Sequence, residues 1–255
     1  MEFPVLIPVG PWLLHPHPVF ETLAFVLGYR LYLRQRRIAG DILSDRDRLE
    51  LLVAAAGGAL MGSRLLALLE DPTQALGRIQ ELSFLFGGKS VVGGLLGGLV
   101  AVELTKAWRG MRTATGDLYA LPLCLAIAVG RIGCFLAGLP DGTHGTPTAL
   151  PWGVDFGDGL PRHPTQLYEI GVVALLAATI VGRRASLRTP GDQFKLFMVG
   201  YLAWRLGVEF IKPDHRLVLG LSAIQVACAL GLLYYARHVP RLLGLGARKP
   251  AWQTG

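Results

Sequence analysis

Uninterrupted apolar runs constrain the fold of this chain more than any other feature. One of them, LPLCLAIAV at residues 121–129, contains no charged side chain. Of the 255 residues, 52% are hydrophobic and only 17% are charged, and the mean hydropathy is +0.44. Segments of this kind fold in a bilayer, where helices satisfy their own backbone hydrogen bonds. The predicted fold class is therefore all-α, in a polytopic membrane protein.

Seven segments of the sequence are long enough to cross a bilayer as helices. The sequence shows no internal repeat, and no linker separates a soluble part, so residues 1–255 are expected to form a single integral membrane domain. The predicted spans are residues 18–34, 49–69, 88–108, 116–139, 164–182, 191–211 and 220–238.

Basic residues are concentrated in alternate connections between these spans. The connections after the first, third and fifth spans, together with the C-terminal tail, hold most of the arginines and lysines outside the spans. Because basic loops stay in the cytoplasm, the N-terminus is predicted outside and the C-terminus inside the cell membrane. The net charge of +7 then favours an anionic membrane surface over nucleic acid as partner. The predicted outer parts are an arm at 1–17 and a loop at 140–163, and residues 240–255 form a cytoplasmic tail.

The histidines of the arm and the three cysteines suggest no metal site. His15 and His17 flank a proline and are expected at the surface. Cys124, Cys134 and Cys228 lie in apolar runs without CxxC or Cys/His ligand spacing, so neither a disulfide framework nor a zinc site is indicated. We therefore expect no metal and no cofactor.

Ionisable residues in four predicted spans share one depth below the outer surface. At 1.5 Å per residue, Arg64, Arg131, Arg205 and Glu169 lie about 8 to 12 Å inside their helices, and Glu209 lies one turn above Arg205. A guanidinium inside a bilayer normally has an anionic partner or a task. Three arginines against two glutamates leave a positive surplus, which favours binding of a phospholipid phosphate in the outer leaflet. A purely structural network of ion pairs is the alternative.

Paired glycines mark one face of the third predicted span. Gly93, Gly94, Gly97 and Gly98 form a pattern of small residues along which another helix, or a lipid chain, can approach closely.

Three blocks of the sequence resemble one family. The blocks are GRIGCFLAG at 130–138, PRHPTQLYE at 161–169 and WRLGVEFIKPD at 204–214. They are similar to the patterns Gly-Arg-x-Gly-Asn-Phe-x-Asn-Gly-Glu, Pro-Arg-His-Pro-Ser/Thr-Gln-Leu-Tyr-Glu and Arg-x-x-x-Glu-Phe-x-Arg-x-Pro-Asp of bacterial prolipoprotein diacylglyceryl transferases. The resemblance covers most of the chain and includes seven helices with an outside N-terminus.

The resemblance implies a transferase of lipoprotein biosynthesis. Such an enzyme moves the diacylglyceryl group of phosphatidylglycerol to the thiol of a lipobox cysteine in a secreted precursor and releases glycerol phosphate. By position, Arg131 and Arg205 would hold the headgroup phosphate, and Glu209 would orient Arg205. The resemblance also implies substrate-binding roles for Arg64, Arg162, Gln166, Tyr168 and Glu169.

The sequence departs from the family pattern at positions that matter for catalysis. Val92 stands where the third helix of the family carries a histidine, a candidate general base. Cys134, Ala137 and Leu139 stand where the family has Asn, Asn and Glu. Headgroup binding is thus expected to persist without the usual means of activating the thiol.

The sequence leaves open which residue takes the place of the missing general base. His144 and His163 suit the removal of a thiol proton because the pKa of histidine lies near neutral pH. Asp141 is a further candidate, and Cys134 is either a nucleophile beside Arg131 or a packing residue. Two functions follow as alternatives: diacylglyceryl transfer to a lipobox cysteine or another acceptor, and binding of anionic lipid without catalysis.

Overall fold

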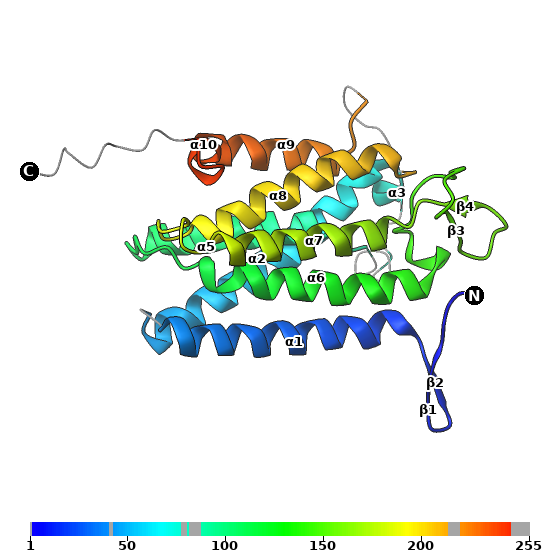
Figure 1. Cartoon of the computed structure of the whole chain (residues 1–255), viewed down its shortest axis with the longest axis horizontal. Coiled ribbons are helices and arrows are strands. Elements are labelled where there is room, and N and C mark those ends of the chain that lie inside the picture. The colour runs from blue at the N-terminus through cyan, green and yellow to red at the C-terminus, as the bar shows by residue number, and fades with distance from the viewer. Residues whose placement is uncertain (1, 41–42, 78–80, 82–87, 214–219, 246–255) are drawn as a thin grey trace, which may run out of the picture.

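The computed structural model describes residues 2–40, 43–77, 81, 88–213 and 220–245. Within this part of the chain, helices of 13 or more residues run side by side as a bundle (Figure 1). They are α1 (Pro16–Ala39), α2 (Asp45–Glu70), α5 (Val91–Trp108), α6 (Asp117–Ala137), α7 (Thr165–Gly182), α8 (Asp192–Val208) and α9 (Ala223–Tyr235).

Shorter elements join and extend these helices. The short helices are α3 (Pro72–Gly77) and α10 (Val239–Leu242), with 3₁₀ turns η1 (Leu139–Asp141), η2 (Glu209–Ile211) and η3 (Ala236–His238). Two hairpins are formed by β1 (Ile7–Val9) with β2 (Trp12–Leu14) and by β3 (Val154–Asp155) with β4 (Pro161–Arg162), both antiparallel.

The helices agree with an all-α membrane protein. Each of the seven predicted spans coincides with one long helix, with ends displaced by a few residues. Of the helices that the structure describes, α2, α5, α6 and α7 are long and apolar enough to cross a membrane. For α1, α8 and α9 the crossing stays a prediction, as does the orientation of the termini. The first helix begins at Pro16, so His17 lies in its first turn and not in a free arm.

Serine residues cap the N-termini of three helices. The hydroxyls of Ser44, Ser90 and Ser222 accept hydrogen bonds from the backbone N–H three residues later, which satisfies one of the free donors of a first helical turn. At Ser222 the side chain of Gln225 completes a reciprocal pair. Local sequence thus sets where α2, α5 and α9 start.

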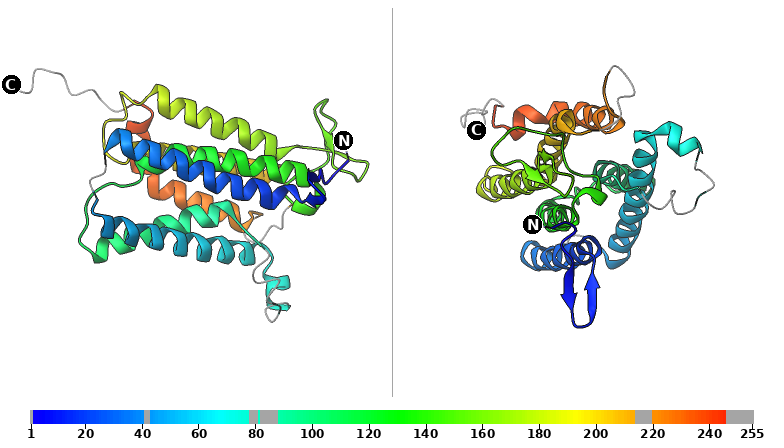
Figure 2. Two further views of the ribbon diagram at one scale, coloured as in Figure 1. Left: turned by 90° about the horizontal axis from the view of Figure 1, so that it is seen from below. Right: turned by 90° about the vertical axis from the view of Figure 1, so that its right-hand side faces the viewer.

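Glycines hold α2 and α5 in close contact. A Cβ at Gly58, Gly62, Gly93 or Gly97 would overlap atoms of the facing helix. The close face predicted around Gly93 and Gly97 is therefore confirmed, and its partner is α2. Figure 2 shows this pair on one side of the bundle and α1 beside α6 on another.

The hydrophobic core lies where α6, α7, α8 and α9 meet. Val173, Ile180, Phe197, Met198 and Cys228 are fully buried there. Both hairpins lie at the end of the bundle where α6 ends and α7 begins (Figure 1). The segment 140–163 and the first residues of the chain therefore cover the same end.

Candidate functional site

A buried ionic cluster joins α6, α7 and α8 near the hairpin end. The Nε of Arg131 lies 3.0 Å from Oε1 of Glu169, and Nη1 of Arg205 lies 3.4 Å from Oε2 of the same carboxylate. The hydroxyl of Tyr201 donates to Oε1 of Glu169 at 2.7 Å. One carboxylate thus holds two arginines from different helices.

Helical spacing positions the α8 side of this cluster. Tyr201, Arg205 and Glu209 are each one turn apart and project from one face. Nη2 of Arg205 contacts Oε1 of Glu209, and Nζ of Lys212 lies 4.0 Å from the same oxygen. Arg205 is consequently held between two carboxylates, which agrees with the predicted orienting role of Glu209.

The cluster keeps an unused hydrogen-bond donor. Nε of Arg205 is buried and has no hydrogen-bond partner among the residues that the structure describes. Buried donors are usually satisfied, so this N–H is available to an acceptor such as a water molecule or a bound anion. A phosphate oxygen is an acceptor suited to a guanidinium.

Arg64 does not join the cluster. Its Nη1 donates to the carbonyl of Gly88, which connects α2 to the segment before α5. The positive surplus predicted from three arginines is therefore not gathered in one place. In the cluster itself, Arg131 and Arg205 face Glu169 and Glu209.

The outer-loop candidates form hydrogen bonds around the start of α7. Nε of Arg162 donates to Asp158 at 2.9 Å. Nδ1 of His163 lies 3.2 Å from the hydroxyl of Tyr168, which also accepts from Nε1 of Trp152 at 2.8 Å. These contacts fold the loop over the end of the bundle.

The remaining loop candidates point in different directions. Nδ1 of His144 lies 3.1 Å from the carbonyl oxygen of Gly145, and its ring packs 6.0 Å from that of Phe156. Nε2 of Gln166 donates to Oγ1 of Thr143 at 3.1 Å. Of these two side chains, Gln166 approaches the residues described next.

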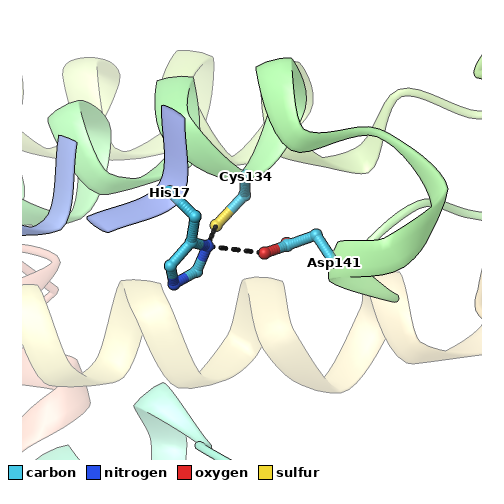
Figure 3. Close-up of side chains that lie close together, drawn as sticks. All are labelled: His17, Cys134 and Asp141. Atoms are coloured by element: carbon cyan, nitrogen blue, oxygen red, sulfur yellow. Dashed lines mark hydrogen bonds and ion pairs between the residues drawn. The ribbon is translucent and has the colours of Figure 1, made fainter. Parts of the chain in front are cut away.

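A second cluster, of His17, Cys134 and Asp141, is the main finding that sequence reasoning missed (Figure 3). Nδ1 of His17 lies 2.6 Å from Oδ1 of Asp141 and 4.0 Å from Sγ of Cys134. One donor atom from each residue lies within 4.8 Å of the other two, close enough to hold a metal ion. His17 was expected at the surface; its side chain is 36% exposed, and its ring also points into this cluster.

The two clusters share Arg131. Its Nη1 donates toward Sγ of Cys134 at 3.8 Å, while its Nε faces Glu169. Cys134 lies one turn after Arg131 on α6, so helical spacing produces the contact. Cys134 is thus buried and in contact with Arg131, and its role as a nucleophile or as a packing residue stays a prediction.

Hydrogen bonds hold Asp141, which lies in the turn after α6, in its charged form. Burial would raise the pKa of Asp141, but hydrogen bonds from His17 and Thr143 lower it below its usual value. Thr143 donates to Oδ2 of Asp141 at 2.6 Å and leaves Oδ1 to His17.

The N-terminal segment is packed against α6 and so delivers His17. The backbone N–H of Val5 donates to the carbonyl of Leu136 at 2.9 Å, and the ring of Phe3 packs edge-on against Phe135 at 5.8 Å. No spacing pattern could reveal the contact, because 117 residues separate His17 from Cys134. The only local signal is the HPHP sequence at the start of α1.

A cavity of about 720 Å³ lies among α1, α2, α5 and α6. One face of α5 lines it from Val91 to Lys106, and Ile127 of α6 lines it one turn before Arg131. Its walls are mostly apolar in the middle of the bundle, with basic side chains such as Arg48 at the far end. Space for apolar groups therefore begins close to the ionic cluster.

Comparisons with known proteins agree with the resemblance read from the motifs. A family model described as prolipoprotein diacylglyceryl transferase matches residues 4–238. A phosphatidylglycerol–prolipoprotein diacylglyceryl transferase of Bordetella bronchiseptica is 34% identical over 256 residues, covering 93% of this chain and 96% of the relative. A protein of the same name from Rhodospirillum rubrum is 33% identical, covering 88% of this chain and 86% of the relative. One from Nitrosomonas europaea is 31% identical, covering 91% and 89%.

Proposed function

Because the chain belongs to the prolipoprotein diacylglyceryl transferase family, we propose that it transfers a diacylglyceryl group from phosphatidylglycerol to a cysteine thiol of a prolipoprotein. In this reaction a C–S bond forms between the thiolate and the glycerol carbon. The C–O bond to the phosphate breaks, and the electron pair leaves with glycerol phosphate. The observation that carries the proposal is the buried cluster of Arg131, Glu169 and Arg205.

The two arginines bind the departing phosphate. Their guanidinium groups come from different helices and meet at one carboxylate, so they face a common point. The unpartnered Nε of Arg205 supplies a donor for a phosphate oxygen. Preorganised donors in a buried site stabilise charge that develops on a leaving group more than water does. Glu169 and Glu209 hold the arginines in place before the lipid arrives.

The apolar cavity takes part of the acyl chains of the donor. It begins at Ile127, one turn from Arg131, so a headgroup at the arginines leaves its chains next to the opening. Its apolar middle offers an environment like the bilayer interior.

The site belongs to the outer leaflet of the bacterial inner membrane in this proposal, with seven spans, an outside N-terminus and a cytoplasmic C-terminus. Supporting it are the alternate basic loops and the position of segment 140–163 beside the ionic cluster. A secreted precursor would then reach the site from outside. Arg162, His163, Gln166 and Tyr168 form the loop side of that approach, and Arg64 supports the start of α5.

Removal of the acceptor proton cannot follow the usual family pattern. Val92 is fully buried and has no group that takes a proton. His144 and His163 remain candidates on the loop, and the cluster of His17, Cys134 and Asp141 adds another. The alternative function, binding of anionic lipid without catalysis, is favoured by the same valine.

Transfer can be tested directly with purified protein in nanodiscs. Labelled phosphatidylglycerol and a lipobox peptide should yield glycerol phosphate and a peptide heavier by one diacylglyceryl group. A peptide with serine in place of the cysteine is the matched control. Lipid binding without release of glycerol phosphate would establish the non-catalytic alternative.

A further inference from the structure

The cluster of His17, Cys134 and Asp141 has the arrangement of metal ligands. The closest contacts of Cys134 Sγ and Asp141 Oδ1 with the histidine are made to the same ring atom, Nδ1 (Figure 3). A catalytic relay of cysteine, histidine and acid uses opposite ring nitrogens, one for the thiol and one for the carboxylate. One ligand atom from each of the three residues lies within 4.8 Å of the other two, which is close enough for the three to share an ion.

Distances in the cluster suit a small tetrahedral ion. Zinc bonds of about 2.0 to 2.3 Å separate neighbouring ligand atoms by about 3.3 to 3.8 Å. The contacts of 2.6 Å and 4.0 Å fall on either side of this range, so side-chain shifts below about 1 Å reach it. One thiolate, one imidazole and one carboxylate form a mixed donor set that favours zinc over calcium or magnesium.

A hydrogen bond orients the carboxylate of the cluster. Thr143 donates to Oδ2 of Asp141 and leaves Oδ1 for an ion, and Gln166 in turn donates to Thr143. The other ring nitrogen of His17, Nε2, lies 4.0 Å from a carboxylate oxygen of Glu21, which is longer than a hydrogen bond. Neighbouring side chains therefore hold Asp141 in place, and Nε2 of His17 has a carboxylate nearby.

The cluster is built into the fold and is not a chance surface group. The side chain of Asp141 is 6% exposed and Cys134 is buried, while His17 is 36% exposed and leaves one side open. The ligands come from α1, α6 and the turn η1. Packing of three separate segments therefore assembles the donors.

We infer that His17, Cys134 and Asp141 bind a zinc ion whose fourth position takes the acceptor cysteine as a thiolate. The second half of this inference rests on the proposed transferase function. Catalytic zinc sites have three protein ligands and one open position, and zinc favours the thiolate over the thiol. The proton leaves to solvent when the sulfur binds, and the later formation of the C–S bond needs no oxidant or reductant. The site replaces the function of the base that Val92 cannot supply, and it differs from the expectation, drawn from the sequence, that the chain holds no metal.

The location of the three ligands next to Arg131 supports this assignment. Arg131 contacts Cys134 on one side and Glu169 of the phosphate cluster on the other. A thiolate on the ion would thus lie close to the glycerol carbon of a phosphatidylglycerol bound at the arginines. The guanidinium between the two clusters offsets part of the negative charge of the ligands.

Metal content is the first test. Protein purified without chelators should contain about one zinc per chain, and Co²⁺ in its place should give the visible absorption bands of a tetrahedral thiolate site. Cys134→Ser and Asp141→Asn should each weaken Co²⁺ binding at least tenfold. Cys124→Ala and Cys228→Ala are the matched controls and should keep it, because both cysteines are buried away from the cluster.

Phosphatidylglycerol binding and circular dichroism establish that the Cys134→Ser protein is folded. Should Cys134→Ser keep the metal while folded, or should wild type bind neither zinc nor Co²⁺, the metal site is disproved and the cluster is an ion pair beside a cysteine.

The acceptor position is tested with the Co²⁺ protein and a lipobox peptide. Addition of the peptide should increase the sulfur-to-cobalt charge-transfer band, and the peptide with serine should not. An unchanged band would disprove the acceptor role of the ion. If the band responds but no glycerol phosphate is released in the zinc protein, the zinc site stands and the proposed transfer is wrong.

Discussion

Arg131 and Glu169 form a buried ion pair, 3.0 Å between Nε and Oε1, that ties α6 to the first turns of α7. The other arm of the same guanidinium reaches Cys134. A single side chain therefore connects the predicted phosphate site to the proposed zinc site. Substitutions in the ionic cluster should therefore change lipid binding, and substitutions in the cluster of His17, Cys134 and Asp141 should change metal binding.

Glu169→Gln should destabilise the free protein and strengthen anion binding. It leaves Arg131 and Arg205 without their shared carboxylate in a buried place, which costs about 3 to 5 kcal/mol. An anionic lipid would restore the balance, so phosphatidylglycerol should raise the melting temperature of this variant more than that of wild type. Arg46→Gln, which breaks an exposed pair with Glu50, is the control and should change stability by about 1 kcal/mol or less. Equal shifts with lipid for Glu169→Gln and wild type would contradict the phosphate role.

Arg131→Lys should lose most phosphatidylglycerol binding although the charge is kept. Lysine cannot hold Glu169 and a phosphate together, since it lacks the planar fork of arginine. We expect at least a tenfold weaker affinity in nanodisc titrations. Arg188→Lys, in the exposed connection between α7 and α8, serves as the control. Full binding by Arg131→Lys would rule out the assignment.

His17, His144 and His163, which lie near the hairpin end, should differ in their effect on transfer. His17→Ala removes a zinc ligand and should lower the rate by about 10²-fold or more, with partial recovery when imidazole is added. His144→Ala and His163→Ala should lower the rate less, because these rings contact Gly145 and Tyr168 and not the cluster. Rates are compared by release of glycerol phosphate. If His163→Ala has the largest effect and imidazole does not rescue His17→Ala, a loop histidine acts as the base.

Gly97→Ala should destabilise the bundle by about 1 to 3 kcal/mol. The added methyl group would overlap the backbone of α2 at Gly58, and neither backbone can move aside cheaply. Gly171→Ala is the matched control, because a Cβ there meets no atom within 4 Å and alanine favours a helix. Thermal unfolding in detergent measures both variants. A neutral Gly97→Ala would show that α2 and α5 separate easily.

Cysteines introduced at opposite ends of the bundle test the proposed orientation. Leu160 and Ser186 are both exposed and lie in connections at opposite ends. An impermeant maleimide added to intact cells should label Leu160→Cys and not Ser186→Cys, since the native cysteines are buried. Labelling of Ser186→Cys alone would reverse the topology and move the site to the inner leaflet.

Most of the fold could be predicted because long apolar runs leave a chain few alternatives in a membrane. The segments around 49–69, 88–108 and 116–139 match α2, α5 and α6 closely, and the glycines of α5 indicated its close contact. The predicted ends of the helices were less accurate, because hydropathy does not reveal which side chains cap a helix. The helix after residue 220, for instance, begins at Ala223 because the side chain of Ser222 caps it.

The ionic cluster of Arg131, Glu169 and Arg205 could be predicted from the sequence, whereas the cluster of His17, Cys134 and Asp141 could not. Arg131, Arg205 and Glu209 lie in apolar helices, where a charge is conspicuous and depth can be counted along the helix. His17 lies at the start of its helix among prolines, where a histidine carries no such signal. Only the packing of the N-terminal segment on α6 brings it to Cys134. Depth along the helices did not reveal that Arg64 lies apart from the ionic cluster, because side chains at equal depth can belong to helices that are not neighbours.

Assembly of the site from distant segments has a consequence for biogenesis. In the proposed topology, His17 would enter the membrane with α1, Cys134 and Arg131 with α6, and Arg205 only with α8. The cluster of His17, Cys134 and Asp141 would then be complete once α6 and the turn after it have packed on α1, and the cluster of Arg131, Glu169 and Arg205 only after α8 follows. A chain stalled before α8 would hold Arg131 and Glu169 without Arg205, so the charges of the buried cluster would be less well balanced.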